Sequence, residues 1–467
     1  MSKKERGKPN VGLAESLLVV LVVLAILGYL IIFKAQSPQV PLLVSVVLLM
    51  LYGYLRGFGW GEVMSGLEEG IKPGVIPLVI FLMIGVLIAT WIYSGTIPTI
   101  MYFGFKIISA KYFLPTVFIV CSLIGLTCGS SFTTVSTMGI AFIGIGTALK
   151  LNPGLTAGAV VSGAFFGANV SPLSSTTNLA AGVGEIDLYD HLKSLVWVDI
   201  PAWFISLILF WVLGMGHDNA NLDSISVMIK QLQGGFWISL WTLLPVILLL
   251  VMAWLKVPAV PSLAFGSFFA VFIGWVHRPI ELNTLADYIM NGYVAHTGSH
   301  SMNELLSKGG ISSMLSSLAL IIFALALGGL LIRFNIIGAL IDGMERFVKG
   351  VDGLILMTAI TCFGVNFLVG EQYLSVILPG ESFKKSFDKA GLPRTYLTRV
   401  LNDAGAAVNS IIPWSVSGVF ISGTLQISPF KYIPYAFFPI AVPILTIVVG
   451  FILGHGQRKT RINQRGD

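Results

Sequence analysis

The sequence predicts an all-α polytopic membrane protein with two inverted-topology repeats of five transmembrane helices, each repeat holding a re-entrant hairpin and a broken helix. Three observations predict this fold: few charged residues, apolar blocks as long as a bilayer is thick, and landmarks that recur at a constant spacing. Of the 467 residues, 55% are hydrophobic and only 11% are charged, against about 25% charged residues in soluble domains. Most of the surface is therefore expected to face lipid, which disfavours a large soluble protein.

Ten apolar segments are long enough for membrane helices, which need roughly 20 residues. They are expected at 12–34, 40–55, 75–95, 155–180 and 194–214 in the first half, and at 237–255, 260–276, 317–333, 396–424 and 432–454 in the second. Two further apolar stretches, 112–149 and 353–383, are interrupted by polar residues and are predicted to be re-entrant hairpins. The first span is too long for the apolar core of a signal peptide and has no small-residue cleavage site before Gln36, so a retained helix is expected.

The two halves share landmarks at one offset. Five spans per half place the second half in the membrane with the opposite orientation, as an inverted repeat requires. An offset of 241 residues relates Gly129 and Gly370, Gly139 and Gly380, Pro172 and Pro413, and Cys121 and Cys362. The predicted division is a tail at 1–11, a first repeat at 12–214, a linker at 215–235, a second repeat at 236–454 and a basic tail at 455–467.

Basic residues predict the orientation, because they concentrate in cytoplasmic segments. Such residues cluster in the first eight positions, at 384–394 and at 458–465, while the acidic linker 215–235 has Lys230 alone. Both termini are therefore expected in the cytoplasm, with the chain crossing a cell membrane many times. The net charge of +6 reports this orientation and does not indicate nucleic-acid binding. No disulfide, metal-ligand spacing, nucleotide loop or enzymatic constellation is recognisable.

Four polar segments interrupt the apolar spans: two hairpin tips at 128–137 and 369–375, and two helix breaks at 167–178 and 408–418. Backbone that leaves a helix at membrane depth must be buried in protein or line a wet cavity. Hydroxyl, amide and carbonyl oxygens suit Na⁺, and the N-termini of half-helices favour an anionic group. We expect the four segments to meet near the bilayer midplane and form a substrate site. The alternative is that their small polar residues only pack helices together.

Nineteen residues are candidates for binding the substrate or a coupling Na⁺. They are Ser130, Ser131, Thr133, Thr134, Asn169, Ser171, Ser174, Ser175, Thr176, Thr177, Asn178, Glu371, Gln372, Asn402, Asp403, Asn409, Ser410, Trp414 and Ser415. No residue is predicted to be catalytic, and no cofactor is expected besides Na⁺ or H⁺ as the coupling ion.

Glu371 and Asp403 are the candidates for proton coupling, because a charged side chain in an apolar region is costly and usually functional. A carboxylate in such a place can hold either a proton or a cation, and this exclusion is the minimal mechanism of antiport. For Asp403, the alternative is an ion pair with Arg399, one helical turn earlier.

Several motifs resemble the NhaC family of Na⁺/H⁺ antiporters in the ion transporter superfamily. They are the run 156–167, Ser171-Pro-Leu-Ser174, Thr176-Thr-Asn178, Gly129-Ser-Ser131, Gln372-Tyr-Leu-Ser375 and Pro413-Trp414. The resemblance covers about residues 12–454. It implies inverted repeats with hairpins and broken helices, a homodimer, and an elevator-like alternating access. The family also includes malate/lactate and amino-acid exchangers.

Departures from the family motif concern charge. Gly167 is usually followed by Asp and Lys, and Ser174 by Asp, but this chain has Ala168, Asn169 and Ser175. The family usually has two acidic residues before the second break, whereas this chain has Asn402 and Asp403. The leading expectation is Na⁺- or H⁺-coupled antiport. The alternative is exchange or uptake of an amino acid or a small carboxylate, which a less charged site suits better.

Overall fold

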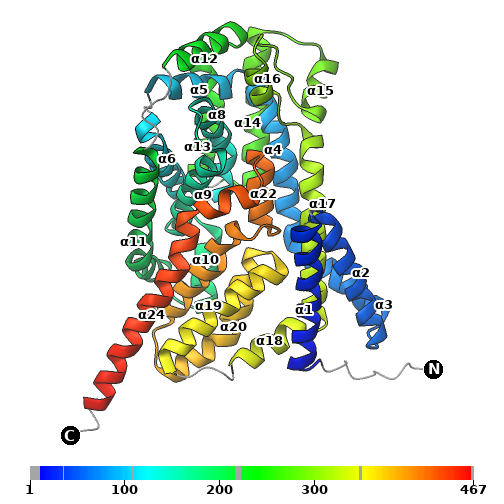
Figure 1. The fold of residues 1–467 in the computed structure, drawn as a ribbon, viewed down its shortest axis with the longest axis vertical. Coiled ribbons are helices and arrows are strands. Elements are labelled where there is room, and N and C mark those ends of the chain that lie inside the picture. Colours follow the sequence, from blue (N-terminus) through cyan, green and yellow to red (C-terminus); the bar gives the residue numbers. More distant parts are fainter. Residues whose placement is uncertain are drawn as a thin grey trace.

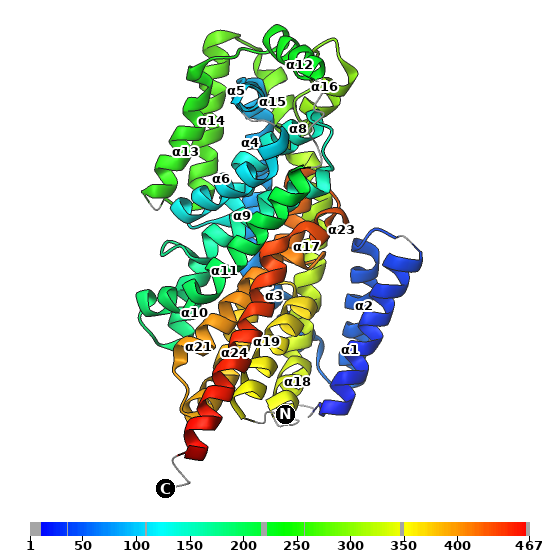
Figure 2. The same cartoon turned by 60° about the vertical axis from the view of Figure 1, so that its left-hand side comes forward.

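The computed structural model describes residues 11–34, 36–107, 110–215, 222–255, 257–345 and 350–463, and every regular element within these ranges is a helix. The molecule is elongated, and most long helices run along or obliquely to its long axis (Figures 1 and 2). The short helices α12 (Leu222–Gly235), α15 (Leu282–Asn291) and α16 (His300–Leu306) cover one end. The start of α1 (Leu13–Gly28) and the end of α24 (Phe437–Asn463) lie at the other.

Long apolar helices make the chain a multi-pass membrane protein and confirm the predicted all-α class. Six helices among the described residues are long and apolar enough to cross a bilayer: Leu13–Ile31, Trp60–Tyr93, Leu188–Met215, Ala259–His277, Ile311–Arg333 and Gly350–Val369. Three bent pairs could each provide a further span, at 226–252, 394–425 and 429–452. Of the predicted tails and linker, residues 1–10, 216–221 and 464–467 lie outside the described residues. The rest of the linker holds α12, and α24 continues into the C-terminal tail.

The start of the predicted span 75–95 is wrong. Helix α3 (Trp60–Ile71) continues through a 3₁₀ turn at Lys72–Gly74 into α4 (Val75–Tyr93), which makes one segment of 34 residues. Glycines let α3 press against α17 (Ile311–Arg333): a Cβ on Gly70 would lie 2.5 Å from the Cα of Gly329. Helix α17 also supplies an ion-pair partner for an acidic residue of α3, since Arg333 lies 3.5 Å from Glu69.

Helix interruptions occur at all four predicted places. Helix α6 (Phe113–Cys128) ends at Gly129, before α7 (Ser131–Thr134) and α8 (Ile140–Ala148), and α19 (Gly350–Val369) ends at Gly370, before α20 (Gln372–Ala390). Helix α9 (Pro153–Asn169) stops five residues before α10 (Ser175–Gly184). The helical segment from α21 (Arg394–Val400) to Ile411 stops four residues before α22 (Val416–Leu425). These breaks confirm the interrupted spans; the opposite orientation of the halves stays a prediction.

Backbone conformation also recurs at the predicted offset of 241 residues. The left-handed region is uncommon for residues other than glycine, yet four pairs of residues with positive φ are related in this way. The pairs are Gly57 and Gly298 (φ 95° and 73°), Gly129 and Gly370 (65° and 75°), Lys150 and Gly391 (57° and 69°), and Glu185 and Gln426 (54° and 56°). Three of these pairs, all except Gly57 and Gly298, lie in turns that follow a helix in both halves. The 241-residue spacing is thus present in the backbone as well as in the sequence.

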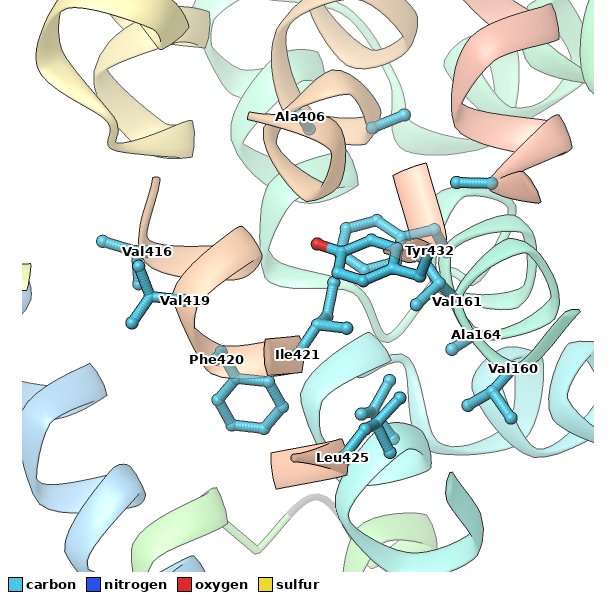
Figure 3. Close-up of a cluster of buried hydrophobic side chains, with 14 of the residues drawn as sticks. Val160, Val161, Ala164, Ala406, Val416, Val419, Phe420, Ile421, Leu425 and Tyr432 are labelled. Atoms are coloured by element: carbon cyan, nitrogen blue, oxygen red, sulfur yellow. The ribbon is translucent and has the colours of Figure 1, made fainter. Parts of the chain in front are cut away.

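An apolar core surrounds the interruptions. Figure 3 shows Val160, Val161 and Ala164 of α9 clustered with Ile421 and Leu425 of α22, and all five side chains are buried. The contact is tight, because a Cβ on Gly139 would lie 2.6 Å from Leu425 and 3.3 Å from Val160. Helices from both halves thus share one core, which fixes the breaks relative to each other.

The two tip glycines give a matched test of this packing. An alanine at either position must adopt the left-handed region, which costs roughly 1–2 kcal/mol. At Gly370 the new Cβ has room, with the nearest atom at 3.4 Å, whereas at Gly129 it would lie 2.6 Å from the backbone of Leu173. We expect Gly129→Ala to lower the melting temperature of the purified protein, followed by tryptophan fluorescence, more than Gly370→Ala does. Equal losses would contradict the close approach at Gly129.

Candidate functional site

Each helix that follows an interruption has a side-chain cap at its N-terminus. The capping oxygens belong to Ser130 (3.1 Å from the Thr133 amide), Glu371 (2.9 Å from Leu374), Ser174 (3.4 Å from Thr177) and Ser415 (2.9 Å from Gly418). Ser and Thr hydroxyls or carboxylates at this position satisfy amides that lack a partner in the helix. Ser130 and Glu371 are related by the 241-residue offset, as are Ser174 and Ser415, so Glu371 places one carboxylate where the first half has a hydroxyl.

A cavity of about 680 Å³ lies where the tips and breaks meet. Val416, the first residue of α22, borders it, so the N-termini of all four interrupted helices reach this cavity. One wall is apolar and comes from α4, α13 (Leu244–Trp254) and α14 (Ala259–His277). The predicted site residues that line it are Ser130, Ser131, Thr133, Asn169, Ser174, Ser175, Thr176, Asn178, Glu371 and Gln372. The cavity thus joins both halves of the chain.

The other predicted site residues lie outside the cavity lining, and several hold the breaks in shape. Asn409 donates to Asn366 Oδ1 at 2.8 Å and accepts the amide of Ser417 at 2.9 Å. The Trp414 indole donates to the carbonyl of Phe367 at 2.7 Å. The remaining residues of this group are Thr134, Ser171, Thr177, Asn402, Asp403, Ser410 and Ser415. The hydroxyl groups of Thr134, Ser171, Thr177, Ser410 and Ser415 all donate to backbone carbonyl oxygens.

Asn169 connects the cavity to a buried polar cluster behind it. Its side-chain nitrogen donates to Asp199 at 2.8 Å and to Asp403 at 3.2 Å, and its oxygen accepts from Asn402 at 2.8 Å. Thr446 of α24 donates to the second oxygen of Asp403. Asp199, Asn402, Asp403 and Thr446 have no exposed surface. One amide therefore holds two carboxyl groups close together, away from solvent.

Local backbone positions this cluster. Asn402 and Asp403 lie in a π-helical turn, Leu401–Ala406, directly before the second break, and π turns inside helices are frequent at functional sites. Asp199 lies in the middle of α11 (Leu188–Met215), two residues before Pro201. Three helical segments distant in sequence thus bring Asn169, Asp199 and Asp403 together.

Sequence reasoning missed Asp199. The signal was present, because Asp199 is a charged residue inside the predicted span 194–214, and such residues are rarely without function. Thr446, in the last predicted span, carried no comparable signal.

The alternative for Asp403 was an ion pair with Arg399. The ion pairs of the described residues do not include this one. The Arg399 guanidinium lies 5.1 Å from the centre of the Tyr396 ring. The side chain is buried, and its Nε and Nη2 have no hydrogen-bond partner in the described part of the chain.

A second charged group links the halves near the end of the molecule where α24 ends. Glu185, directly after α10, lies 3.1 Å from Lys384 and pairs with Arg394, which also contacts Asp388 at 2.9 Å. Hydrogen bonds from Arg394 and Lys384 hold the pKa of the Glu185 carboxyl below its usual value. The carboxylates of Glu185 and Asp388 are exposed and the two basic side chains are half-buried, so solvent screens each pair and each is worth little singly.

A cavity bordered by four helix interruptions, in a multi-pass membrane protein, is typical of a secondary transporter. Comparisons with known proteins identify which kind. Residues 163–453 match the Na⁺/H⁺ antiporter family. The chain belongs to this family, which confirms the resemblance seen in the sequence.

Three relatives show the range of the family. The Na⁺/H⁺ antiporter NhaC of Alkalihalophilus pseudofirmus is 36% identical, over 98% of this chain and 99% of that protein. The malate-2H⁺/Na⁺-lactate antiporter of Bacillus subtilis is 33% identical, over 94% of each chain. The arginine/ornithine antiporter ArcD of Halobacterium salinarum is 32% identical, over 95% of this chain and 92% of that protein.

The charged group around Glu185 predicts a pH-dependent contribution to stability. Because the pKa of Glu185 is lowered in the folded state, its contribution is present above the ordinary Glu pKa of about 4.3 and is lost as the pH falls through the lowered value. We expect Glu185→Gln to lower the melting temperature slightly at pH 7 and to match the wild type in strong acid. Asp190→Asn is the control, since the Asp190 carboxylate lies on the exposed start of α11 and its ion pair among the described residues is with the exposed Lys193, at 3.3 Å. A deficit that persists unchanged in acid would contradict the ion-pair origin.

Proposed function

We propose that this chain is a Na⁺/H⁺ antiporter of NhaC type that works by alternating access. One observation carries the proposal: Asn169, which lines the cavity between the interrupted helices, directly contacts two buried carboxyl groups, Asp199 and Asp403. Ionised carboxylates are costly to bury without a partner. A proton or a cation therefore has to accompany this pair, and competition between them couples H⁺ to Na⁺.

The exchange cycle follows from this exclusion. Binding of Na⁺ at the carboxyl groups displaces a proton, and binding of a proton displaces Na⁺. Without either ion the cluster is charged, and the change of access is then too costly because a net charge would move within the membrane. Exposure of the cavity first to one side and then to the other exchanges the two ions. Glu371, buried at the N-terminus of α20 and bordering the cavity, is a second acidic group on the same path. The 241-residue recurrence of the breaks supports repeats that move relative to each other, in the elevator-like manner that the resemblance implies.

Orientation and assembly complete the proposal. The start of α1, the end of α24 and the open end of the α19–α20 hairpin lie at the same end of the molecule (Figures 1 and 2). Lys384, Lys385 and Lys389 lie toward that open end of the hairpin, which supports a cytoplasmic location for this end and both termini. The two repeats are assigned to 12–214 and 236–454. The homodimer rests on the resemblance alone.

Proteoliposomes containing a pH dye test the antiport directly. An inward Na⁺ gradient is expected to drive protons out and raise the internal pH. Asp403→Asn keeps the shape of the side chain but cannot alternate between charged and protonated forms, so its signal should fall to that of protein-free liposomes. Asp190→Asn, at the exposed start of α11, should behave as wild type. An unchanged response in Asp403→Asn would remove this residue from the mechanism, and no response in wild type would refute Na⁺/H⁺ exchange.

Exchange of an organic anion or amino acid is the second candidate function. The cavity, at about 680 Å³, is large for a single inorganic ion, and four helix N-termini border it, where a carboxylate is favoured. Ser175 stands here where a family carboxylate is usual, and its hydroxyl is 3.0 Å from that of Tyr373.

This candidate predicts counterflow: liposomes preloaded with unlabelled lactate, malate, arginine or ornithine should accumulate the same compound in labelled form. Accumulation without any Na⁺-driven change of internal pH would favour organic exchange. The absence of accumulation for all four, together with a Na⁺-driven pH change, would leave Na⁺/H⁺ antiport.

A further inference from the structure

The buried cluster behind Asn169 contains oxygen atoms without partners. Asp199 Oδ1 and Asn402 Oδ1 are both fully buried and have no hydrogen-bond partner among the described residues. A buried polar oxygen without a partner costs on the order of 1–3 kcal/mol. Two such atoms belong to neighbouring side chains, since Asp199 and Asn402 both hydrogen-bond to Asn169. These two oxygens are acceptors, and a single cation would satisfy both at once.

Net charge limits what the cluster can bind. Asp199 and Asp403 both accept from the amide of Asn169, and Arg399, buried one helical turn before Asp403, interacts electrostatically with both carboxyl groups. Arginine stays protonated in proteins, so two carboxylates and one guanidinium leave a single negative charge. One monovalent cation neutralises this charge, whereas a divalent ion or a second monovalent ion would leave a buried positive charge.

We propose that Asp199, Asp403 and the side-chain oxygen of Asn402 bind a single Na⁺ next to the cavity, and that Arg399 is a fixed positive charge that limits the site to one ion. Asn169 separates this site from the cavity and positions both carboxyl groups. The inference deepens the proposed antiport, on which it rests, by placing the ion beside the cavity rather than within it. It gives the site a carboxylate from each half of the chain.

Oxygen chemistry fits this ion. Carboxylate and amide oxygens are hard ligands, which suit alkali and alkaline-earth cations. Two neighbouring donor groups already have partners: Thr446 donates to Asp403, and the side-chain amide of Asn169 donates to both carboxyl groups. The free acceptors are therefore available to an ion without breaking the existing hydrogen bonds.

Calorimetric titration of the purified full-length protein with NaCl, at constant ionic strength in choline chloride, tests the site. Wild type should bind one Na⁺ per chain. Asp199→Asn removes a charged ligand and should weaken binding by roughly 10- to 100-fold. Asp190→Asn, on the same helix but exposed, should bind as wild type. Arg399→Gln removes the fixed positive charge and should raise the ratio above one Na⁺ per chain.

A second variant covers the case in which Asp199→Asn does not fold. Asn402→Leu removes the Oδ1 ligand and keeps a branched side chain with the same number of heavy atoms, and it should also weaken Na⁺ binding. Wild-type affinity in whichever of these two variants folds would overturn the proposed site and leave Na⁺/H⁺ antiport standing. A ratio that stays at one in Arg399→Gln would overturn the role of the arginine. Wild type that binds no Na⁺ would instead refute the proposed antiport, and the site with it.

Discussion

The side chain of Asn169 holds together two carboxyl groups that neither half of the protein could bury alone. Asp199 comes from the first half and Asp403 from the second, and the same amide nitrogen donates to both. Removing two like charges from water is costly unless each has a partner or a counter-ion. The two halves must therefore stay in register at this point, so that Asp199 and Asp403 both remain within hydrogen-bond distance of Asn169.

The surrounding structure preserves that register. Glycines in the left-handed region end α6 and α19 within the protein, and caps at Ser130, Glu371, Ser174 and Ser415 restart helices at the cavity. Such breaks are tolerated at membrane depth only where protein or water satisfies the freed backbone. The apolar core between α9 and α22 (Figure 3) supplies the rigid support. The polar interruptions form the cavity, and the tight apolar packing around them keeps them in place.

Much of this architecture could be predicted from the sequence, because lipid imposes strong length and composition constraints. Polar runs inside apolar spans predicted the position of each interruption. A segment rich in Asn, Ser and Pro at membrane depth must either be buried in protein or line a wet cavity. The segment 60–93 was predicted too short. Its first turns contain Glu62 and Glu69, and their partner, Arg333 of α17, is distant in sequence. Which small polar residues face the cavity was not predictable either. Asn409 and Ser410 are adjacent to the second break, yet both lie outside the cavity lining.

Asp199 shows the limit of reading motifs locally. The first broken helix lacks the carboxylates usual in the family, with Ala168 and Ser175 in their places, and the sequence alone therefore suggests a site with little charge. In three dimensions a carboxylate from α11 reaches the same point through Asn169. The charge comes from another helix, and no local sequence pattern shows that two residues 30 positions apart are in contact.

The central claim is that Asn169 joins the carboxyl groups of both halves into one cation-responsive centre. It is tested most directly by the Na⁺-dependent shift in melting temperature of Asn169→Leu, since a ligand that binds only the folded state stabilises it by mass action. The account predicts that added Na⁺, at constant ionic strength, raises the melting temperature of wild type and leaves that of Asn169→Leu unchanged, although Asp199 and Asp403 are both intact. An equal Na⁺-dependent rise in the variant would contradict it.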